Sequence, residues 1–328
     1  MAELTYRAAL AEGIAREMDR DPSVVLLGED VGAAGGVFKL TEGLFDRFGP
    51  RRVVDTPISE QAIVGAAMGA AMTGLRPVAE LMFSDFFAVT WDMVINQIAK
   101  SRYMTDGQVR VPLVLHTANG PGLRFGAQHS QSVESWLMAI PGLKVVAPSN
   151  PADMVGLMVA AIRDDDPVIV CASKGLLPTK GDVPDGEHAL PLGQAAVLRE
   201  GTDCTLVALA AMVPRAVDAA ERLQADHGIS AEVLDLRTLI PLDARAVLAS
   251  VAKTARLFTV EENPRVLGWG AEIVSLVADE GFWSLDAPIV RITAPHIPIP
   301  SAAALEDATI PSVDRIVDTV RTTLEASR

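Results

Sequence analysis

Short apolar runs alternate along the chain with longer segments of helical period. In the first half, residues 24–27, 78–82, 113–116, 144–147 and 168–171 are rich in Val, Leu and Ile and predict strands. Between them, apolar residues recur at helical spacing over 5–19, 59–74, 87–104, 132–139 and 151–163. Such an alternation favours parallel sheets with helices on both faces. The chain is therefore expected to have an α/β fold.

The same alternation resumes after a stretch rich in glycine and proline. Residues 174–193 contain four glycines and three prolines, which interrupt any regular period. Beyond them, strands are predicted at 205–209, 231–234, 257–260 and 289–292, with helices near 213–227, 243–252, 268–279 and 312–325. A chain of 328 residues has room for about two domains. We predict two three-layer domains on parallel sheets, residues 1–175 and 193–328, joined by a linker over 176–192.

Composition argues against several classes of protein. The chain has 42 Asp and Glu against 28 Lys and Arg, a net charge of −14, which repels nucleic acids and anionic membranes. Its two cysteines, Cys171 and Cys204, form neither a disulfide framework nor a zinc-binding spacing. No run approaches the roughly 18 apolar residues of a membrane span. The first residues lack a secretion signal, so a cytoplasmic location is expected.

Common nucleotide-binding and hydrolase motifs are missing. The segment GEDVGAAGG lacks the GxGxxG spacing, and there is no GxxxxGK[ST] or GxSxG string. Polar candidates lie instead where predicted strands meet loops or helices, the positions at which open α/β sheets bind ligands. They are Glu29, Glu60 and His129. From the residues alone, a solvated turn, a helix-end carboxylate and an ordinary loop histidine are the competing explanations.

The predicted helix at 59–74 is rich in small residues. Gly65, Gly69 and Thr73 share one face, and Ala62, Ala66 and Ala70 line the stripe beside it. Each interior glycine costs about 1 kcal/mol relative to alanine, so a close contact should offset the cost. A subunit interface and packing against the chain's own sheet are both consistent with this pattern.

Several long strings carry a family resemblance. LLGEDVG, VVDTPISEQAIVGAAMGAAMTGLRPVAELMFSDF, NQIAKSRYM, GAQHSQSVESWLMAIPGLKVVAPSNPADMVGLM and, in the second half, LGQAAVLREGTDCTLVALAAMV and RTLIPLD resemble β subunits of thiamine-diphosphate-dependent E1 components. These belong to 2-oxo-acid and acetoin dehydrogenase complexes. The resemblance implies a transketolase-like pyrimidine-binding domain followed by a transketolase C-terminal-like domain.

Two short segments bear on the subfamily. The run ITAPHIPIP at 292–300 and the segment Ser84-Asp85-Phe86 are more similar to acetoin dehydrogenase β subunits than to pyruvate or branched-chain members. The chain departs from the family at 172–177, where it reads ASKGLL and relatives typically carry Glu-His-Lys-x-Leu-Tyr. Acetoin is therefore the first expectation for the substrate, with pyruvate and branched-chain 2-oxo acids as alternatives.

The resemblance also implies a divided active site. In this family the α chain holds Mg²⁺ and the diphosphate through a GDG…N motif, which this sequence lacks, and the β chain holds the aminopyrimidine. Glu60 matches the glutamate that pairs with N1′ of that ring, and Glu29 an acid beside it. Phe86 and Met82 match residues of the ring's walls, and His129 matches a histidine that faces the substrate. The chain is expected to be inactive without its α subunit.

A cation and several partners complete these expectations. The resemblance places a structural monovalent cation such as K⁺ on backbone oxygens of a site formed by Leu113, Ala161, Ile162, Asp164 and Asp166, although an Asp triplet is also typical of a solvated helix end. It implies a heterotetramer of two α and two β subunits, with the helix at 59–74 at the β–β contact. A lipoyl-bearing E2 chain is the expected acyl acceptor. A non-catalytic scaffold subunit is the competing class.

Overall fold

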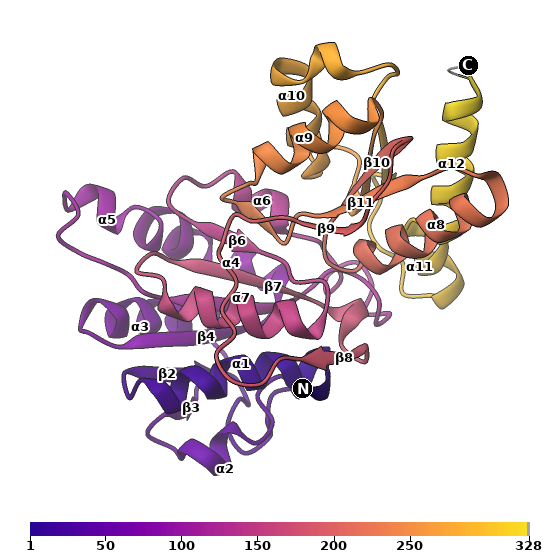
Figure 1. The fold of residues 1–328 in the computed structure, drawn as a ribbon. Coiled ribbons are helices and arrows are strands. Elements are labelled where there is room, and N and C mark those ends of the chain that lie inside the picture. The colour runs from indigo at the N-terminus through magenta and orange to yellow at the C-terminus, as the bar shows by residue number, and fades with distance from the viewer. Residues whose placement is uncertain (327–328) are drawn as a thin grey trace.

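The computed structural model describes residues 1–326, which form two sheets covered by helices (Figure 1). The larger sheet has seven strands in the order β12-β6-β7-β5-β4-β2-β3. Its parallel strands are β2 (Val24–Gly28), β3 (Val53–Asp55), β4 (Arg76–Phe83), β5 (Val114–Asn119), β6 (Lys144–Val146) and β7 (Val168–Ser173). The five strands predicted in the first half are confirmed. The sequence analysis missed β3, a three-residue strand at the sheet edge.

Helices cover both faces of this sheet. On one side α1 (Tyr6–Arg20) and α7 (Pro151–Arg163) pack together, and on the other lies α3 (Glu60–Met72). Successive strand residues enter opposite cores: Leu26 of β2 packs in the core with α1, and Leu27 in the core with α3. This alternation explains why runs that are apolar at every position are strands here.

The helices predicted at 5–19 and 151–163 each begin at a side-chain cap. The Thr5 hydroxyl accepts a hydrogen bond from the Ala8 amide at 3.3 Å and opens α1. At α7, the Asn150 side chain accepts from the Asp153 amide at 2.9 Å, with Pro151 in the first turn. Both caps could be read from the sequence because they depend on neighbouring residues only.

The prediction of a single helix over 87–104 is wrong. After a 3₁₀ turn (Ser84–Phe86), the segment consists of α4 (Phe87–Asp92), a π-helical turn (Met93–Ile98) and α5 (Ser101–Met104). Its ladder shifts where the Ala99 amide bonds to the Val94 carbonyl at 3.1 Å. Close by, the Ser101 hydroxyl donates a hydrogen bond to the Gln97 carbonyl oxygen at 2.6 Å, so side-chain bonding competes with the regular ladder. The helix predicted at 132–139 is reduced to α6 (Glu134–Met138).

The smaller sheet has five strands in the order β14-β13-β10-β11-β9. β10 (Cys204–Ala208), β11 (Ala231–Asp235), β13 (Leu257–Pro264) and β14 (Val290–Ala294) are parallel, and β9 (Ala196–Arg199) is antiparallel. One face packs against α8 (Met212–His227) and α12 (Val313–Ala326), the other against α9 (Ala244–Thr254) and α10 (Gly270–Glu280). The predicted elements are confirmed here, whereas β9 and α11 (Ala303–Thr309) were not predicted.

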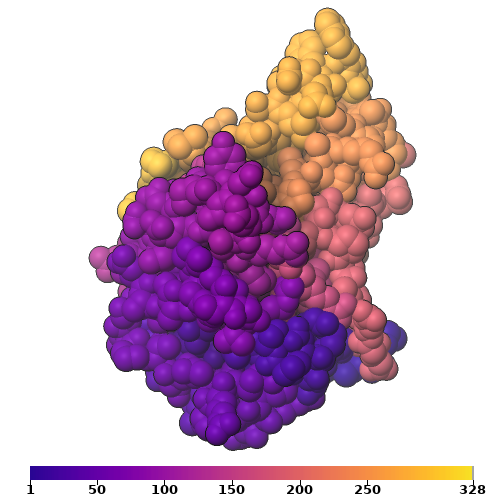
Figure 2. All heavy atoms as spheres, turned by 90° about the vertical axis from the view of Figure 1, so that its left-hand side faces the viewer, coloured from indigo at the N-terminus to yellow at the C-terminus, as the bar shows by residue number. Residues whose placement is uncertain are grey.

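The two sheets share a strand exchange and a core. β12 (Thr238–Ile240) follows the smaller sheet in sequence but pairs antiparallel with β6 of the larger one. Next to it, Arg237 donates two hydrogen bonds, at 2.7 and 2.8 Å, to the Asp153 carboxylate of α7. One apolar cluster contains Val145 from the first half and Leu239 from the second. Figure 2 shows the orange and yellow residues of the second half rising above the purple first half and in contact with it.

The segment between the sheets is partly regular. β8 (Lys180–Val183) pairs antiparallel with β1 (Ala2–Thr5), so the stretch predicted as a linker contains a strand that fastens the N-terminus. The remaining short elements are α2 (Leu44–Phe48) and two 3₁₀ turns, Lys174–Leu176 and Phe282–Ser284. None of the helices described within residues 1–326 has the length and apolar character needed to cross a bilayer.

Candidate active site

Polar and aromatic residues gather at the carboxyl ends of four adjacent strands. Glu29 follows β2, Phe86 follows β4, His129 lies in the loop after β5, and Lys174 follows β7. Because β2, β4, β5 and β7 are parallel, these ends meet at one edge of the sheet. The fold thereby brings together residues that are more than a hundred positions apart in sequence.

Three phenylalanine rings form a cluster with the imidazole of His129. The His129 ring centroid lies 4.6 Å from that of Phe83 and 5.5 Å from that of Phe86, both edge to face. Phe83 contacts Phe86 at 5.5 Å and Phe125 at 5.4 Å, again edge to face. Such pairs fix ring orientation as well as burying apolar area. His129 is therefore held against an aromatic wall, half-buried.

Both domains hold the loop that carries His129. The buried Lys174 ammonium donates a hydrogen bond to the His129 carbonyl oxygen. The Gln131 side chain donates to Asp85 at 2.8 Å. From the second domain, Glu306 of α11 accepts a hydrogen bond from the Gly122 amide. The position of His129 thus depends on packing between the domains.

Two carboxyl groups lie at the same edge of the sheet, one after β2 and one after β3. Glu60 is the first residue of α3 and is half-buried, while Glu29 is only 9% exposed. Burial raises the pKa of Glu29, and the negative charge of Glu60 raises it further. The two carboxyl groups are therefore close enough to interact electrostatically. Met82 and Phe86 are half-buried and pack against the core beneath.

A second buried acid lies behind Glu29. Glu80 of β4 is 3% exposed; burial raises its pKa to about 8, and the charge of Glu29 adds to the effect. One of its oxygens lies 3.6 Å from Nε2 of His116 on β5, whose pKa burial lowers to about 3. At neutral pH both groups are consequently uncharged. Within residues 1–326, neither His116 ring nitrogen has a hydrogen-bond partner.

Family comparisons match both halves of the chain. Residues 2–180 match the family described as "Transketolase, pyrimidine binding domain", and residues 193–316 match "Transketolase, C-terminal domain". A protein of Bacillus subtilis named "Acetoin:2,6-dichlorophenolindophenol oxidoreductase subunit beta" is 50% identical, over 94% of each chain. The chain belongs to the family of E1 β subunits of acetoin and pyruvate dehydrogenases.

Other relatives support the same family. The protein of that name from Cupriavidus necator is 46% identical over 99% of each chain. The mitochondrial "Pyruvate dehydrogenase E1 component subunit beta-2" of rice is 47% identical over 96% of this chain and 85% of its own length. A solved structure titled "Split gene transketolase, inactive beta4 tetramer" matches the fold with a TM-score of 0.81 over 99% of each chain, at 23% identity. The transketolase-like fold expected from the sequence is confirmed.

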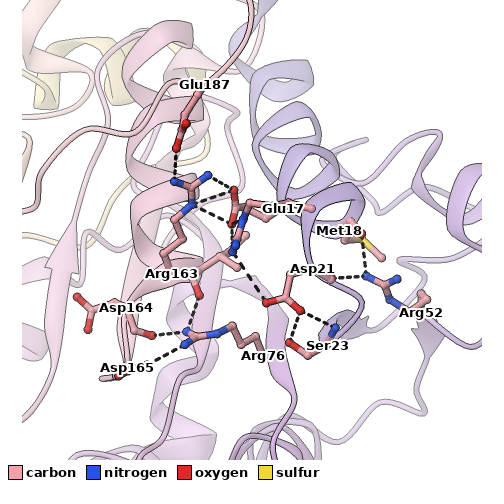
Figure 3. A network of polar contacts seen from close by, with 12 residues as sticks. Glu17, Met18, Asp21, Ser23, Arg52, Arg76, Arg163, Asp164, Asp165 and Glu187 are labelled. Atoms are coloured by element: carbon pink, nitrogen blue, oxygen red, sulfur yellow. Dashed lines mark hydrogen bonds and ion pairs between the residues drawn. The ribbon is translucent and has the colours of Figure 1, made fainter.

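The predicted cation loop is already rich in charge pairs. Arg76 donates to the carbonyl oxygens of Ile162 and Asp164, at 3.0 and 2.9 Å, and to the Asp165 carboxylate at 2.7 Å (Figure 3). The Leu113 carbonyl accepts from Val168 at 2.9 Å. The remaining expected ligands are similarly engaged: the Ala161 carbonyl accepts from the Asp164 amide at 3.3 Å, and the Asp166 carboxylate pairs with Arg102. The cation site stays a prediction.

The small-residue helix presents part of its small face to the outside. Ile63, Val64 and Ala67 of α3 are buried against the sheet. Ala66 and Gly69 are exposed, and a Cβ built on Gly69 would meet no atom within 4 Å. The chain's own sheet therefore does not explain Gly69, which leaves the interface prediction standing.

Several residues of the site were not singled out from the sequence. Glu80 and His116 interrupt otherwise apolar strands, and Lys174 ends one, which is the pattern that could have marked them as buried polar groups. Glu306 could not have been found, because its place beside the His129 loop depends on the arrangement of two domains.

Proposed function

We propose that this chain is the β subunit of an acetoin-cleaving E1 enzyme, active in a heterotetramer of two α and two β subunits with thiamine diphosphate. The observation that carries the proposal is the placement of Glu29, Glu60, Phe86 and His129 at one edge of the larger sheet. The 50% identity to an acetoin oxidoreductase β subunit supports the same proposal. The reaction would split acetoin into acetaldehyde and a two-carbon unit. Lipoamide of the E2 chain, as oxidant, would accept that unit as an acetyl thioester while its disulfide is reduced.

The residues present fit an aminopyrimidine ring. A flat heteroaromatic ring needs an apolar wall and a hydrogen-bonding group at its edge, and Phe86 with Met82 can provide the first. Glu60 can provide the second, because a carboxyl group at the first residue of α3 can hydrogen-bond to a ring nitrogen. When bound, the cofactor supplies a carbon nucleophile, while the protein orients it. Burial and the nearby charge of Glu60 raise the pKa of Glu29, which supports an acid beside the proposed ring site.

His129 is the proposed donor to the substrate. Its ring packs edge to face on both Phe83 and Phe86, so a hydrogen bond from it is aimed before the substrate arrives. A donor fixed in a partly apolar site stabilises negative charge that develops on the substrate oxygen. The same group can return a proton to that oxygen or remove one later.

The α subunit supplies the other half of the proposed site. Among residues 1–326, no three His, Cys, Asp or Glu side chains converge as a metal ion would require. The proposal assigns Mg²⁺ and the diphosphate to the α chain, and it predicts no turnover by the β chain alone. The experiment is dye reduction by the chain co-expressed with its α partner, with thiamine diphosphate and Mg²⁺.

A Glu60→Gln variant tests the enzyme against the scaffold alternative. It removes the ionisable proton and keeps the size of the side chain, so turnover should fall by at least about 100-fold with assembly unchanged. Exposed Glu280, at the end of α10, provides a matched control: Glu280→Gln should retain activity. Normal turnover by Glu60→Gln would contradict the proposed role and favour a scaffold.

Substrate choice is tested by offering acetoin, pyruvate and 2-oxoisovalerate in parallel. The proposal expects the highest kcat/KM for acetoin, because this ratio compares transition-state binding of competing substrates. A preference for pyruvate would instead support a pyruvate dehydrogenase β subunit. The 47% identity to the rice pyruvate dehydrogenase subunit favours this alternative.

A further inference from the structure

Lys174 is a lysine with no solvent exposure, at the end of β7. Lysine is almost never fully buried without a partner, because the ammonium loses its hydration. Its ammonium donates a hydrogen bond to the His129 carbonyl oxygen and lies 5.1 Å from the centre of the Phe83 ring. The same Phe83 ring packs edge to face on the His129 imidazole. One side chain therefore contacts both the backbone of His129 and the ring that orients its side chain.

Three carboxyl groups from different elements act on Lys174. They are Asp85 after β4, Glu262 of β13 and Glu306 of α11. Each of them also touches the His129 loop or its flanks: Asp85 accepts from Gln131, Glu306 accepts from the Gly122 amide, and Glu262 lies 3.5 Å from the Ser132 hydroxyl. Lys174 thus interacts with three groups that also hold the loop or its flanks.

Burial lowers the pKa of Lys174 to about 8, while the three carboxylates oppose the shift. The direct hydrogen bond of the ammonium goes to the loop backbone, at the His129 carbonyl oxygen. A buried charge that bonds to a loop carbonyl restricts that loop more than a neutral side chain would.

We propose that Lys174 is a positioning residue, which holds His129 in register for the substrate step and leaves the Glu60-dependent activation of the cofactor untouched. The inference rests on the proposed function of His129. The expected independence of cofactor activation is argued from the sheet order. β5 and β4 separate β7, which precedes Lys174, from β2, the strand that precedes Glu29.

The test compares Lys174→Met with Lys100→Met in the assembled holoenzyme. Methionine keeps the length of the side chain and removes the charge. Lys100 is a matched control, because its ammonium also bonds to a loop carbonyl, that of Pro141. We expect Lys174→Met to lower kcat/KM for acetoin by roughly 10- to 100-fold, the cost of a small misplacement of a reacting group. Lys100→Met should match the wild type.

Two further measurements separate positioning from a general structural effect. Deuterium exchange at the reactive carbon of the cofactor should stay within about twofold of wild type, since it reports activation and not substrate handling. The histidine ring resonance of His129 should shift, since its contacts with Phe83 and Phe86 change ring-current shielding. An equal loss of exchange and turnover, or an unmoved His129 resonance, would overturn the proposal.

A double variant tests whether Lys174 acts through His129. If Lys174 acts through His129, adding Lys174→Met to His129→Ala should cost little beyond His129→Ala alone. Additive losses would overturn the proposal. Full activity of His129→Ala would instead refute the proposed function, and the inference with it. Should Lys174→Met fail to assemble, Lys174→Gln, which keeps a donor and removes the charge, is measured in the same way.

Discussion

Replacing the buried Glu80 by glutamine should stabilise the chain at neutral pH. Glu80 lies inside the seven-stranded sheet with one oxygen 3.6 Å from His116, and within residues 1–326 that oxygen accepts no hydrogen bond. Burial raises its pKa from 4.5 to about 8, so the folded chain keeps a proton that the unfolded chain releases. Glutamine has the same shape and releases no proton.

The magnitude follows from the two pKa values. Above pH 4.5 the unfolded chain gains free energy by ionising Glu80 while the folded chain does not, so stability is lost as the pH rises from 4.5 to about 8. The loss is about 1.4 kcal/mol per pH unit, which amounts to about 3 kcal/mol at pH 7. Glu80→Gln should therefore exceed the wild type by about that amount at pH 7 and by little at pH 4.5.

The assay is urea unfolding of the full chain and of Glu80→Gln at several pH values between 5 and 8. The difference between the two free energies of unfolding isolates Glu80, since the other buried acids are common to both proteins. Glu280→Gln, on an exposed helix end, is the control and should show no growing difference. A difference that does not change with pH would refute the reasoning, because it would mean that Glu80 is ionised beside a protonated His116.

Two further predictions concern assembly and the domain junction. Gly69→Leu should leave the free energy of unfolding of the chain nearly unchanged, because a Cβ there meets no atom of its own subunit within 4 Å. The same variant should prevent assembly of the heterotetramer. Light scattering that still gives the full mass would show that α3 is not in the interface. Arg237→Met should destabilise the chain by about 3 kcal/mol, because it leaves the buried Asp153 carboxylate without its two hydrogen bonds. Urea unfolding measures this loss, and a loss below about 1 kcal/mol would show that the pair does not join the domains.

The sequence by itself determined the local structure and the family. The strands are read from apolar runs, and the starts of α1 and α7 from Thr5 and Asn150, because those features depend on residues within a few positions. The long strings around Glu60 and His129 were enough to indicate E1 β subunits. The same local reasoning failed at 87–104, where side-chain hydroxyls and a π-helical turn break a period that looked continuous.

Only the tertiary structure decided how the site is supported. The strand β12 joins a sheet whose other members lie far earlier in the chain, and its pairing follows from docking of the domains. Glu306 reaches the His129 loop across that junction, and Lys174 meets His129 because β5 and β7 are neighbours in the sheet. Whether a carboxyl or an ammonium is buried, and therefore where it titrates, is a property of packing from several elements at once. No short stretch of sequence contains that information.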